Sequence, residues 1–528
     1  MTEKGVHMKA VILAGGEGTR LKNISGDLPK PMVSVLGKPI LEYIIENLKN
    51  NGFDDIYLMT GFRGEKIREY FGDGSRLGVK LNYYREPYQM GTAGALYYLR
   101  DEIKEDFVLT MGDLMLSVDF ERFMSFHKSC GGKVTLFLHP NTHPYDSDIM
   151  LTENVGRPED FTEDKCGIGV SDDVFFGSAG AVAQENENAA ASAQTGSPAG
   201  KAQIANAATA AQPGKRVTGI IGKKEERTGF YFNQVNSGVY AFSPDIFDLI
   251  GKPAEAEDYE KSIAEAEKSG MDAEGLKKLK KSYKTDLDKD IIRPLISKGE
   301  VFSYRSTEYV KDMGTPERYE EVSADLKSGL IAARNLKNRQ KCIFLDRDGT
   351  INRTADFISS AGRLELLDRT AEAIHMINRS EYLTIVITNQ PVIARGGCSF
   401  RELSEINAKL ETMLGEKGAY IDDLYYCPHH KDKGFDGEVP ELKFVCRCRK
   451  PAPGLIEKAA AEHNIDLEGS YMIGDMTQDI ACGKNAGVKT VLVKTGIAGT
   501  DGKYDVKADA EAADLYDAVS MILGKQIS

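Results

Sequence analysis

The chain has 528 residues, 41% of them hydrophobic, and a formal net charge of −13 at pH 7. A chain of this length is expected to divide into two or more domains. Its acidic charge argues against a general nucleic-acid binder, because phosphate backbones require a basic surface. No apolar run approaches the length that spans a bilayer, and the N-terminus lacks the apolar core of a signal peptide. With 8 cysteines a disulfide scaffold is disfavoured, so we expect a cytoplasmic protein without membrane or nucleic-acid partners.

Two α/β domains are predicted, because short β-branched runs alternate with amphipathic stretches. The first covers residues 8–326 and should contain a doubly wound parallel sheet. Within it, an Ala-rich segment of about 157–215 has almost no large apolar residue and is predicted to be a disordered insertion. Residues 254–285 predict a solvated helical pair. After a polar, basic connector at 327–340, KCIFLDRDGT restarts the alternation and predicts a second domain over 341–526.

A glycine-rich segment, LAGGEGTRL (13–21), follows the first predicted strand. Glycine lets backbone N–H groups approach phosphate oxygens, and arginine can bind a phosphate through two hydrogen bonds. The candidate phosphate-binding residues are Gly15, Gly16, Gly18, Thr19 and Arg20. Lys30, between two prolines, would place a second cation beside the same phosphates. Taken singly, a tight turn explains the glycines and a solvated loop explains the lysine; the segment is not a P-loop, since the Gly-Lys-Ser/Thr ending is absent.

Together, GGEGTRL and PKPM resemble the sugar-1-phosphate nucleotidyltransferase family, and further motifs follow in that family's order over 8–326. The resemblance implies a Rossmann-like domain with a mixed sheet. MGTAGAL (90–96) would bind the base, VNSGVYAF (235–242) the sugar, and the aspartates of TMGD and KDMGTPERY would hold Mg²⁺. The residues assigned in this way are Gly91, Thr92, Asp113, Asn236, Gly238 and Asp312.

The mechanism that this resemblance implies is an in-line displacement on a nucleoside triphosphate. The sugar 1-phosphate oxygen attacks the α-phosphorus and pyrophosphate leaves, while Arg20 and Lys30 offset the charge that builds on the leaving group. The segment IIGKKEE departs from the family pattern. We assign Lys224 as the ligand of the sugar phosphate, and the choice between it and Lys223 stays open.

Glu86 stands just before the predicted base-binding segment, in REPYQMGTAG. A carboxylate can accept hydrogen bonds from both N1–H and the exocyclic amine of guanine, whereas adenine offers no matching pair of donors. We therefore hypothesise GTP as the nucleotide. The alternative is that Glu86 merely pairs with Arg85 or Lys80.

Four short motifs of the second half, FLDRDGT, VITNQ, CRKPAPG and IGDMTQD, each supply polar residues near the end of a predicted strand or in the loop beyond it. Acidic loops are common, but four such motifs in this order predict one site, because parallel strands end at the same edge of a sheet. The candidates are Asp346, Asp348, Thr388, Asn389, Lys450, Asp475 and Asp479. Thr388 and Asn389 can donate to phosphate oxygens.

These motifs resemble the haloacid dehalogenase (HAD) superfamily of phosphatases. The resemblance implies that Asp346 is the nucleophile and forms an aspartyl-phosphate, and that Asp348 acts as general acid and then as general base. Asp346, Asp475 and the backbone carbonyl of Asp348 would hold Mg²⁺. Lys450 would neutralise the phosphate and the nucleophile.

Three of the 8 cysteines gather in CPHHKDKGFDGEVPELKFVCRCRK (427–450). The pattern C-x-H…C-x-C offers a set of four ligands that matches a closed tetrahedral Zn²⁺ site. The predicted ligands are Cys427, His429, Cys446 and Cys448. Disulfides and four unrelated buried residues are the alternatives. The neighbouring His430 is expected to be exposed.

Within the HAD superfamily, the cysteine pattern and TNQPVIARG resemble the branch of heptose-bisphosphate 7-phosphatases and histidinol-phosphatases, with Pro391 and Val392 as departures. The resemblance implies that Arg395 and Arg449 contact a distal anionic part of the substrate. HPYDSD (143–148) is similar to the heptose-1-phosphate guanylyltransferases of the first family.

The two resemblances together imply a bifunctional enzyme of GDP-heptose biosynthesis. It would remove the 7-phosphate of heptose 1,7-bisphosphate and transfer GMP from GTP to the 1-phosphate. The alternatives are a hexose-1-phosphate guanylyltransferase fused to another small phosphatase, such as one for histidinol phosphate, and a scaffold with decayed sites. The retained aspartates of both domains argue against the scaffold. The oligomeric state is left open.

Overall fold

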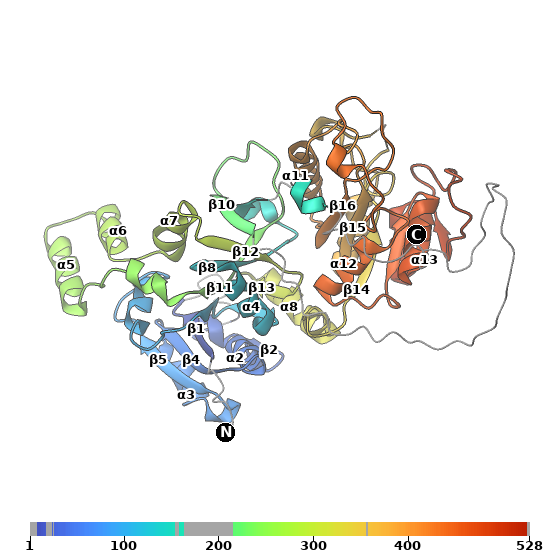
Figure 1. The fold of residues 1–528 in the computed structure, drawn as a ribbon. Helices are drawn as coiled ribbons and strands as arrows, with labels where there is room; N and C mark the ends of the chain where they lie inside the picture. The colour runs from blue at the N-terminus through green and yellow to red at the C-terminus, as the bar shows by residue number, and fades with distance from the viewer. Residues whose placement is uncertain are drawn as a thin grey trace, which may run out of the picture.

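The computed structural model describes residues 8–16, 24, 26–153, 158–162, 215–354 and 357–524. They form two α/β domains that lie beside each other (Figure 1). In this described part of the chain, no helix has both the length and the apolar character needed to cross a bilayer.

The N-terminal domain is built on a nine-stranded mixed sheet in the order β5-β4-β1-β6-β11-β8-β12-β10-β9. The first four strands of that order are parallel, and β11 runs antiparallel to both of its long neighbours. The mixed sheet implied by the family resemblance is thus present. The strands are β1 (Met8–Ala14), β4 (Phe53–Thr60), β5 (Lys80–Arg85), β6 (Phe107–Met111), β8 (Val134–His139), β9 (Ile149–Thr152), β10 (Lys215–Ile221), β11 (Val235–Phe242) and β12 (Val301–Arg305).

Two small sheets and eight α-helices complete the described part of this domain and its connection to the second. The small sheets pair β2 (Ser34–Val35) with β3 (Lys38–Pro39) and β7 (Leu114–Ser117) with β13 (Tyr309–Asp312). The helices are α2 (Ile40–Asn50), α3 (Gly64–Phe71), α4 (Phe120–Cys130), α5 (Ala256–Lys268), α6 (Ala273–Ser282), α7 (Arg293–Ile296), α8 (Pro316–Ser328) and α9 (Leu330–Ala333).

The large sheet has a hydrophobic core on each face, as a doubly wound domain requires. Helices α2, α3 and α4 cover one face, where Ile44, Phe71 and Phe123 are buried. Short helical turns and α7 cover the other, where Leu96 and Leu295 are buried. The predicted helical pair is α5 and α6, which extend away from the sheet in Figure 1.

The predicted disordered insertion of about 157–215 needs a correction at both ends. Residues 158–162 are structured, because η6 (Pro158–Phe161) stacks Phe161 on Phe400 of the second domain with ring centroids 5.4 Å apart. Lys215 already belongs to β10, which pairs with β9 across the gap. The prediction otherwise lies outside the described residues.

The predicted polar connector of 327–340 is folded and partly buried. Helix α8 extends to Ser328, and α9 follows directly. Arg334 is buried and forms an ion pair with Asp422 of the second domain at 3.5 Å. Gln340 is buried too and donates to three backbone carbonyls. The polar side chains that suggested a solvated connector are instead buried and hydrogen-bonded within the fold.

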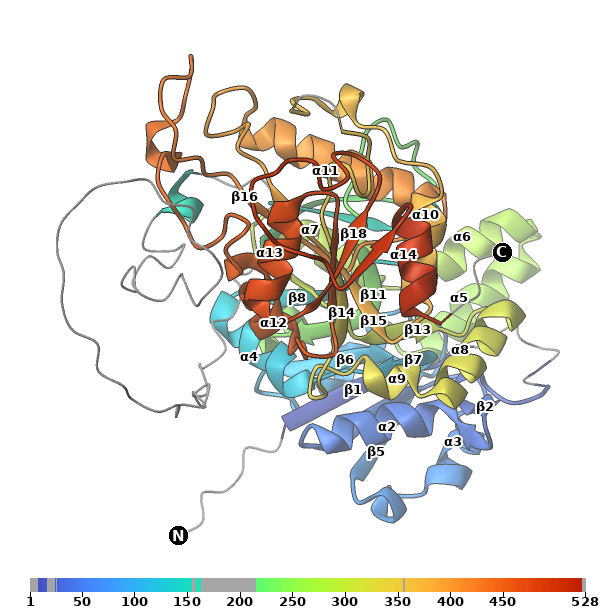
Figure 2. The same cartoon turned by 90° about the vertical axis from the view of Figure 1, so that its right-hand side faces the viewer.

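The C-terminal domain has a six-stranded parallel sheet in the order β16-β15-β14-β17-β18-β19. Figure 2 shows α10 and α14 on one side of the strands and α12 and α13 on the other, with a core on each face. The strands are β14 (Lys341–Leu345), β15 (Tyr382–Asn389), β16 (Asp423–Cys427), β17 (Tyr471–Gly474), β18 (Lys489–Val493) and β19 (Ala510–Ala512). The helices are α10 (Thr370–Asn378), α11 (Phe400–Glu416), α12 (Gly454–His463), α13 (Thr477–Ala486) and α14 (Leu515–Ile522).

Candidate active sites

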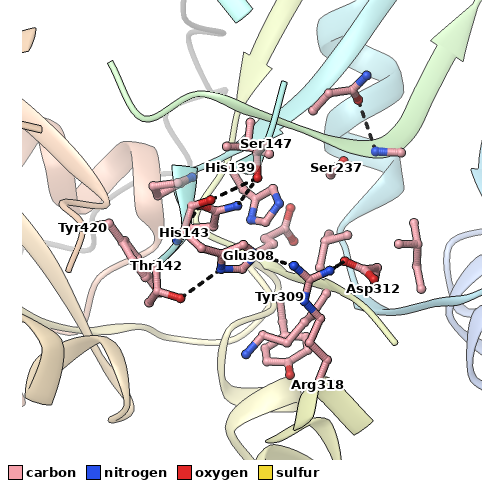
Figure 3. Close-up of a pocket in the computed structure, with 18 of the residues that line it drawn as sticks. His139, Thr142, His143, Ser147, Ser237, Glu308, Tyr309, Asp312, Arg318 and Tyr420 are labelled. Atoms are coloured by element: carbon pink, nitrogen blue, oxygen red, sulfur yellow. Dashed lines mark hydrogen bonds and ion pairs between the residues drawn. The ribbon is translucent and has the colours of Figure 1, made fainter. Parts of the chain in front are cut away.

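A cavity of about 740 Å³ lies at one end of the N-terminal sheet and reaches the junction with the second domain (Figure 3). Among the residues that line it, five were predicted from four separate motifs: Lys30, Asp113, Asn236, Gly238 and Asp312. The tertiary structure therefore gathers the predicted metal, sugar and phosphate ligands at one place.

Strand pairing brings the two predicted metal ligands together. In the small sheet Asp312 pairs with Leu114, and the backbone N–H of Met313 donates to the carbonyl oxygen of Asp113 at 3.2 Å. Gly112, just before Asp113, lies close against the end of β1, because a Cβ there would be 3.0 Å from the carbonyl oxygen of Leu13. Two carboxylates at one strand end are the hard oxygen ligands that Mg²⁺ takes, so the residues present fit the predicted ion.

Each of these carboxylates has a cationic partner. The Lys30 ammonium donates to Asp113, and the Arg318 guanidinium donates to Asp312. Figure 3 shows that Arg318 also reaches His143, with Nη2 2.8 Å from Nε2. Burial would raise the pKa of Asp312, but Arg318 and then Lys30 outweigh burial and lower that pKa. Asp312 is therefore held ionised, as a metal ligand must be.

Sequence reasoning assigned no role to Arg318 or His143, although both lie in motifs that it had singled out. Arg318 stands on the first turn of α8, six residues beyond Asp312, which is close enough to fold back on the strand end. That spacing was an available signal. The pairing of His143 with Arg318 spans 175 residues, so no local pattern could show it.

The predicted nucleotide segments are described in part. Gly15 and Gly16 follow β1, whereas Gly18, Thr19 and Arg20 lie outside the described residues. Gly91 has a φ of +85°, and a Cβ there would lie 2.4 Å from the carbonyl oxygen of Thr285. Thr92 accepts a hydrogen bond from the backbone of Leu287 at 2.7 Å. In this structure both residues hold the 285–287 turn, and their contact with a base stays a prediction.

Glu86 lies against the glycine loop: its Oε1 would be 3.7 Å from a Cβ at Gly15. Burial raises the pKa of its carboxyl to about 7, opposed by a hydrogen bond from Met90. Lys80, which was one of its two alternative partners, instead pairs with Asp55 at 3.4 Å. The contact of Glu86 with a nucleotide base stays a prediction.

Two groups predicted to bind the sugar phosphate, Asn236 and one of the two candidate lysines, lie at the wall of the cavity. Asn236 accepts from the backbone of Gly238 at 3.2 Å and donates to the Tyr240 hydroxyl at 3.1 Å, on the wall of the cavity. Of the two candidate lysines, Lys223 lines the cavity, and its backbone N–H donates to Asp148 at 2.8 Å. Lys224 is not among the residues that line the cavity, and the choice between the two lysines as ligand of the sugar phosphate stays a prediction.

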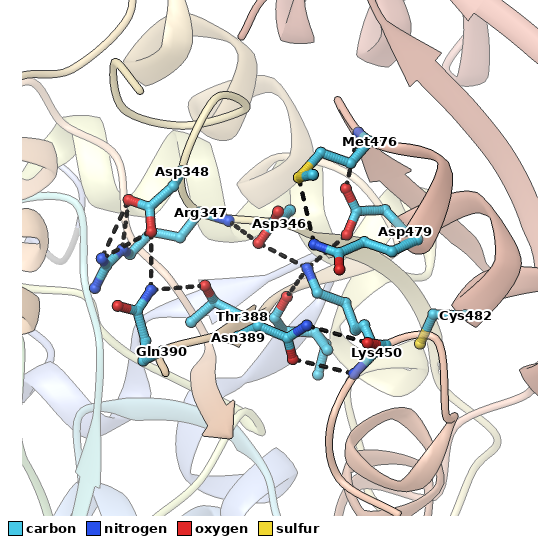
Figure 4. A network of polar contacts seen from close by, with 12 residues as sticks. Asp346, Arg347, Asp348, Thr388, Asn389, Gln390, Lys450, Met476, Asp479 and Cys482 are labelled. Atoms are coloured by element: carbon cyan, nitrogen blue, oxygen red, sulfur yellow. Dashed lines mark hydrogen bonds and ion pairs between the residues drawn. The ribbon is translucent and has the colours of Figure 1, made fainter. Parts of the chain in front are cut away.

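The second site lies where β14, β15 and β17 of the C-terminal sheet end (Figure 4). The register Leu345↔Ile473 places Asp346 and Asp475 beyond neighbouring strand ends. The Lys450 ammonium lies 2.7 Å from Asp346 and 2.7 Å from Asp479, and all three side chains are buried. The structure thus brings the predicted nucleophile and the predicted lysine into contact.

Three carboxylates, of Asp346, Asp475 and Asp479, face this one ammonium, and each has an oxygen within 4.8 Å of the others. Burial and the neighbouring carboxylates raise the pKa of Asp346 to about 8, although Lys450 opposes the shift. Burial raises the pKa of Asp475 to about 7, and its Oδ1 has no hydrogen-bond partner among the described residues. This uncompensated negative charge and the free oxygen fit a divalent cation such as Mg²⁺.

Asp348, the predicted acid and base, is held by three side chains. Arg347 contacts both of its carboxylate oxygens, while Asn352 and Gln390 donate to it at 2.9 Å each. Sequence reasoning missed these three. All three lie inside or next to motifs that the sequence had already indicated. The sequence did not show, however, that their side chains contact Asp348.

The predicted phosphate donors lie beside Lys450. Thr388 is buried and accepts from Gln390 at 3.0 Å. The Asn389 amide donates to the Lys450 carbonyl at 3.2 Å and accepts from its backbone N–H at 3.0 Å. In this structure Asn389 orients the lysine, and direct contact of either residue with phosphate stays a prediction. Pro391 and Val392, the departures from the family pattern, are buried just beyond.

The four predicted zinc ligands form one buried cluster. Contacts between the Sγ and Nδ1 atoms range from 3.2 to 3.6 Å, too long for a disulfide bond of about 2.05 Å. A tetrahedral Zn²⁺ would hold such atoms at roughly 3.5–3.8 Å. The Nε2 of His429 donates to the carbonyl of Phe161 at 2.8 Å, and its Nδ1 faces the sulfurs of Cys427 and Cys448, as a metal-ligating nitrogen would. The cluster can hold zinc.

Next to this cluster, Arg395 and Arg449 form a cationic pair. Burial and then Arg449 lower the pKa of Arg395, whose guanidinium lies between the rings of Phe357 and Phe435. His430, expected to be exposed, is buried with its Nε2 2.7 Å from Arg395. The expectation of exposure was wrong, because His430 packs against Arg395 and makes this contact with it. Two adjacent guanidinium groups suit an anion.

Both domains of the chain are similar to known protein families. Residues 9–164 match the family described as Nucleotidyl transferase, and residues 447–518 match HAD-hydrolase-like. A D-glycero-β-D-manno-heptose-1,7-bisphosphate 7-phosphatase of Pasteurella multocida is 40% identical over 180 residues, which cover 33% of this chain and 95% of the relative. The D-glycero-D-manno-heptose-1,7-bisphosphate 7-phosphatase of Chlorobaculum tepidum is 37% identical over 36% of this chain and 97% of the relative.

Among solved structures, HddC from Yersinia pseudotuberculosis, complexed with GMP-PN, covers 60% of this chain and 99% of its own. Its sequence identity is 20% and the TM-score is 0.38.

Proposed function

Because the chain belongs, over a third of its length, to the family of heptose-1,7-bisphosphate 7-phosphatases, we propose that it is a bifunctional enzyme of nucleotide-heptose synthesis. It removes the 7-phosphate from D-glycero-D-manno-heptose 1,7-bisphosphate. It then joins the heptose 1-phosphate to a nucleotide, with GTP as the donor and pyrophosphate as the second product. The observation that carries the proposal is the presence, in one chain, of two separate carboxylate sites suited to phosphate chemistry.

In the phosphatase, the Asp346 carboxylate attacks the phosphorus, and Asp348 gives its proton to the sugar oxygen as that oxygen leaves. Lys450, within 2.7 Å of Asp346, offsets the negative charge of both the nucleophile and the phosphate. Asp348, whose carboxylate is oriented by Arg347 and Gln390, then accepts the proton of the water that hydrolyses the aspartyl-phosphate. A Mg²⁺ ion at Asp346, Asp475 and Asp479, with the Asp348 carbonyl, would neutralise the remaining charge.

In the transferase, an oxygen of the sugar 1-phosphate attacks the α-phosphorus of the nucleotide. Asn236 and Lys223 are the residues on the cavity that would bind the sugar phosphate. Asp113 and Asp312 would hold Mg²⁺, which screens the phosphates from each other. Lys30 would offset the charge of the departing pyrophosphate, and Glu86 would accept hydrogen bonds from guanine.

The zinc cluster has a structural task in this proposal. Cys446 and Cys448 lead directly to Arg449 and Lys450. A tetrahedral Zn²⁺ would fix that loop, so that the phosphate-binding lysine and the arginine pair reach the site together. Arg395 and Arg449 would bind the 1-phosphate, the anionic group at the far end of the substrate.

A coupled assay tests the proposal. The full chain is incubated with the heptose bisphosphate, Mg²⁺ and each of the four NTPs, and phosphate and nucleotide-heptose are measured. We expect both products, with GTP as the best donor. Histidinol phosphate and mannose 1-phosphate serve as competing substrates, and a preference for either would replace the heptose assignment. The Asp346→Asn variant should release no phosphate yet still convert supplied heptose 1-phosphate.

A further inference from the structure

We propose that helix α11 of the phosphatase domain is a structural part of the transferase site, with Glu411 and Thr412 as positioning residues for the sugar-phosphate pocket. The inference rests on the proposed function for its substrate. The phosphatase domain would thereby hold the loops that shape the transferase cavity.

Two side chains of α11 hold the transferase segment that leads into β11. The Thr412 hydroxyl accepts from the backbone N–H of Tyr231 at 2.9 Å and lies 3.0 Å from the carbonyl oxygen of the same residue. Glu411, the residue before Thr412, accepts through Oε2 from the backbone N–H of Asn233 at 2.7 Å. Glu411, Thr412 and Asn233 are buried, so water cannot replace these partners.

From Asn233 the contacts continue to the cavity wall. Its side-chain amide makes two hydrogen bonds with the backbone of Asn141, at 2.7 and 3.1 Å. Asn141 in turn accepts from the backbone of His143 at 3.0 Å and donates to Ser147 at 3.2 Å. Asn141, His143 and Ser147 all line the cavity. An unbroken series of hydrogen bonds therefore connects α11 to the 141–147 loop on the cavity wall.

Two further contacts fix the helix against the same loops. Arg305, the last residue of β12, places both terminal nitrogens 3.4 Å from Glu411 and donates to the Ile421 carbonyl at 3.0 Å. Gly415 packs on Pro144 so closely that a Cβ there would lie 2.5 Å from the proline Cγ. Glycine is needed at this contact, since any larger side chain would push the loop away.

The cavity itself uses residues of both domains. His375, Asn378, Arg379 and Tyr420 of the phosphatase domain line it together with the transferase residues. Figure 3 shows Tyr420 on the same cavity as His143 and Asp312. The transferase pocket is thus incomplete without the second domain.

The same helix also serves the phosphatase. One turn before Glu411, the Asn407 side chain accepts from Arg347 at 3.0 Å, and Arg347 holds Asp348. Residues four apart lie on one face of a helix, but their targets lie in different active sites. This arrangement supplies a matched control within a single helix.

The test compares Thr412→Val with Thr412→Ser in the full chain. Valine keeps the shape and loses both hydrogen bonds, whereas serine keeps them. We expect the KM for heptose 1-phosphate to rise roughly five- to thirtyfold in Thr412→Val. The KM for GTP and the phosphatase kcat/KM should stay within about twofold, and Thr412→Ser should restore the wild-type KM. Asn407→Ala should show the opposite pattern, with loss confined to the phosphatase.

Amide hydrogen exchange of the same proteins gives a readout that needs no substrate. Exchange at residues 227–235 should be faster in Thr412→Val and normal in Thr412→Ser. An unchanged KM for heptose 1-phosphate, or equal losses in both activities, would overturn the inference. If the wild-type chain turns over no sugar 1-phosphate, the proposed transferase function fails, and exchange at 227–235 alone then decides whether α11 positions this segment.

Discussion

Arg347 and Asp348 are neighbours in the chain, and their side chains form an ion pair inside the phosphatase site, with Nη2 3.0 Å from Oδ2. Arg347 is fully buried, and Asn407 on α11 accepts from its Nη1. Burial would raise the pKa of Asp348, but Arg347 and then Asn352 and Gln390 lower it. The predicted acid and base is therefore held as an oriented carboxylate by a cation that also contacts α11 of the same domain.

Replacing this cation tests its role. Arg347→Lys keeps the charge but cannot contact both Asp348 and Asn407, so Asp348 loses its fixed orientation. We expect the phosphatase kcat/KM to fall about 10- to 100-fold, with nucleotidyl transfer unchanged. Arg353→Lys is the control, because Arg353 is exposed and pairs with Glu365 and Asp368, neither of which belongs to the site. Equal activity of the two variants would contradict a positioning role for Arg347.

Lys450 should be important for stability as well as for activity. In Lys450→Met the buried carboxylates of Asp346 and Asp479 lose their shared partner. We expect the free energy of unfolding to fall by about 3–5 kcal/mol, measured by urea denaturation at pH 7 without Mg²⁺. Lys484→Met removes an exposed pair with Asp509 and should cost about 0–1 kcal/mol. Added Mg²⁺ should recover part of the loss; no loss at all would show that the carboxylates do not need the lysine.

The pKa of Glu86 predicts a pH dependence of GTP binding. Burial raises this pKa to about 7, so the carboxyl is neutral below that pH and becomes a double acceptor for guanine above it. The KM for GTP should therefore fall as pH rises from 6 to 8. In Glu86→Gln this slope should vanish and the preference for GTP over ATP should decrease. A Glu86→Gln enzyme with the wild-type pH profile and preference would remove Glu86 from base recognition.

Zinc removal should separate the two activities. Chelation, or Cys446→Ser, frees the loop that carries Arg449 and Lys450, so phosphatase activity should drop at least about tenfold while transfer from heptose 1-phosphate continues. Zinc content is measured in parallel by atomic absorption. Cys130→Ser, on α4 and outside the cluster, should retain both metal and activity. Loss of both activities to the same extent would argue against a loop-fixing metal.

The two neighbouring lysines provide a further matched pair. Lys223 lines the transferase cavity, so Lys223→Ala should raise the KM for heptose 1-phosphate about tenfold through loss of a charged hydrogen bond. Lys224→Ala should leave that KM within about twofold. A raised KM in Lys224→Ala and an unchanged KM in Lys223→Ala would instead make Lys224 the ligand of the sugar phosphate.

The local sequence was sufficient to identify the chemistry. Asp346, Asp475 and the other predicted ligands occur in short motifs near strand ends, and parallel strands must end at a common edge. The cluster of Cys427, His429, Cys446 and Cys448 was predictable for a different reason, since two close pairs of suitable residues already define most of a tetrahedral metal site. Alternation of strands and helices likewise indicated both sheets, because it follows from the period of buried residues within one segment.

The contacts between distant segments were decided only by the tertiary structure. His430 is buried because Arg395 reaches it across 35 positions, and Phe161 is ordered because it meets Phe400. Glu411 binds Asn233 across 178 positions. No spacing along the chain encodes such pairs; they depend on how two finished domains pack. The sequence by itself thus determined which reactive groups the protein has, whereas the packing of α11 between the sites decided which residues hold those groups in place.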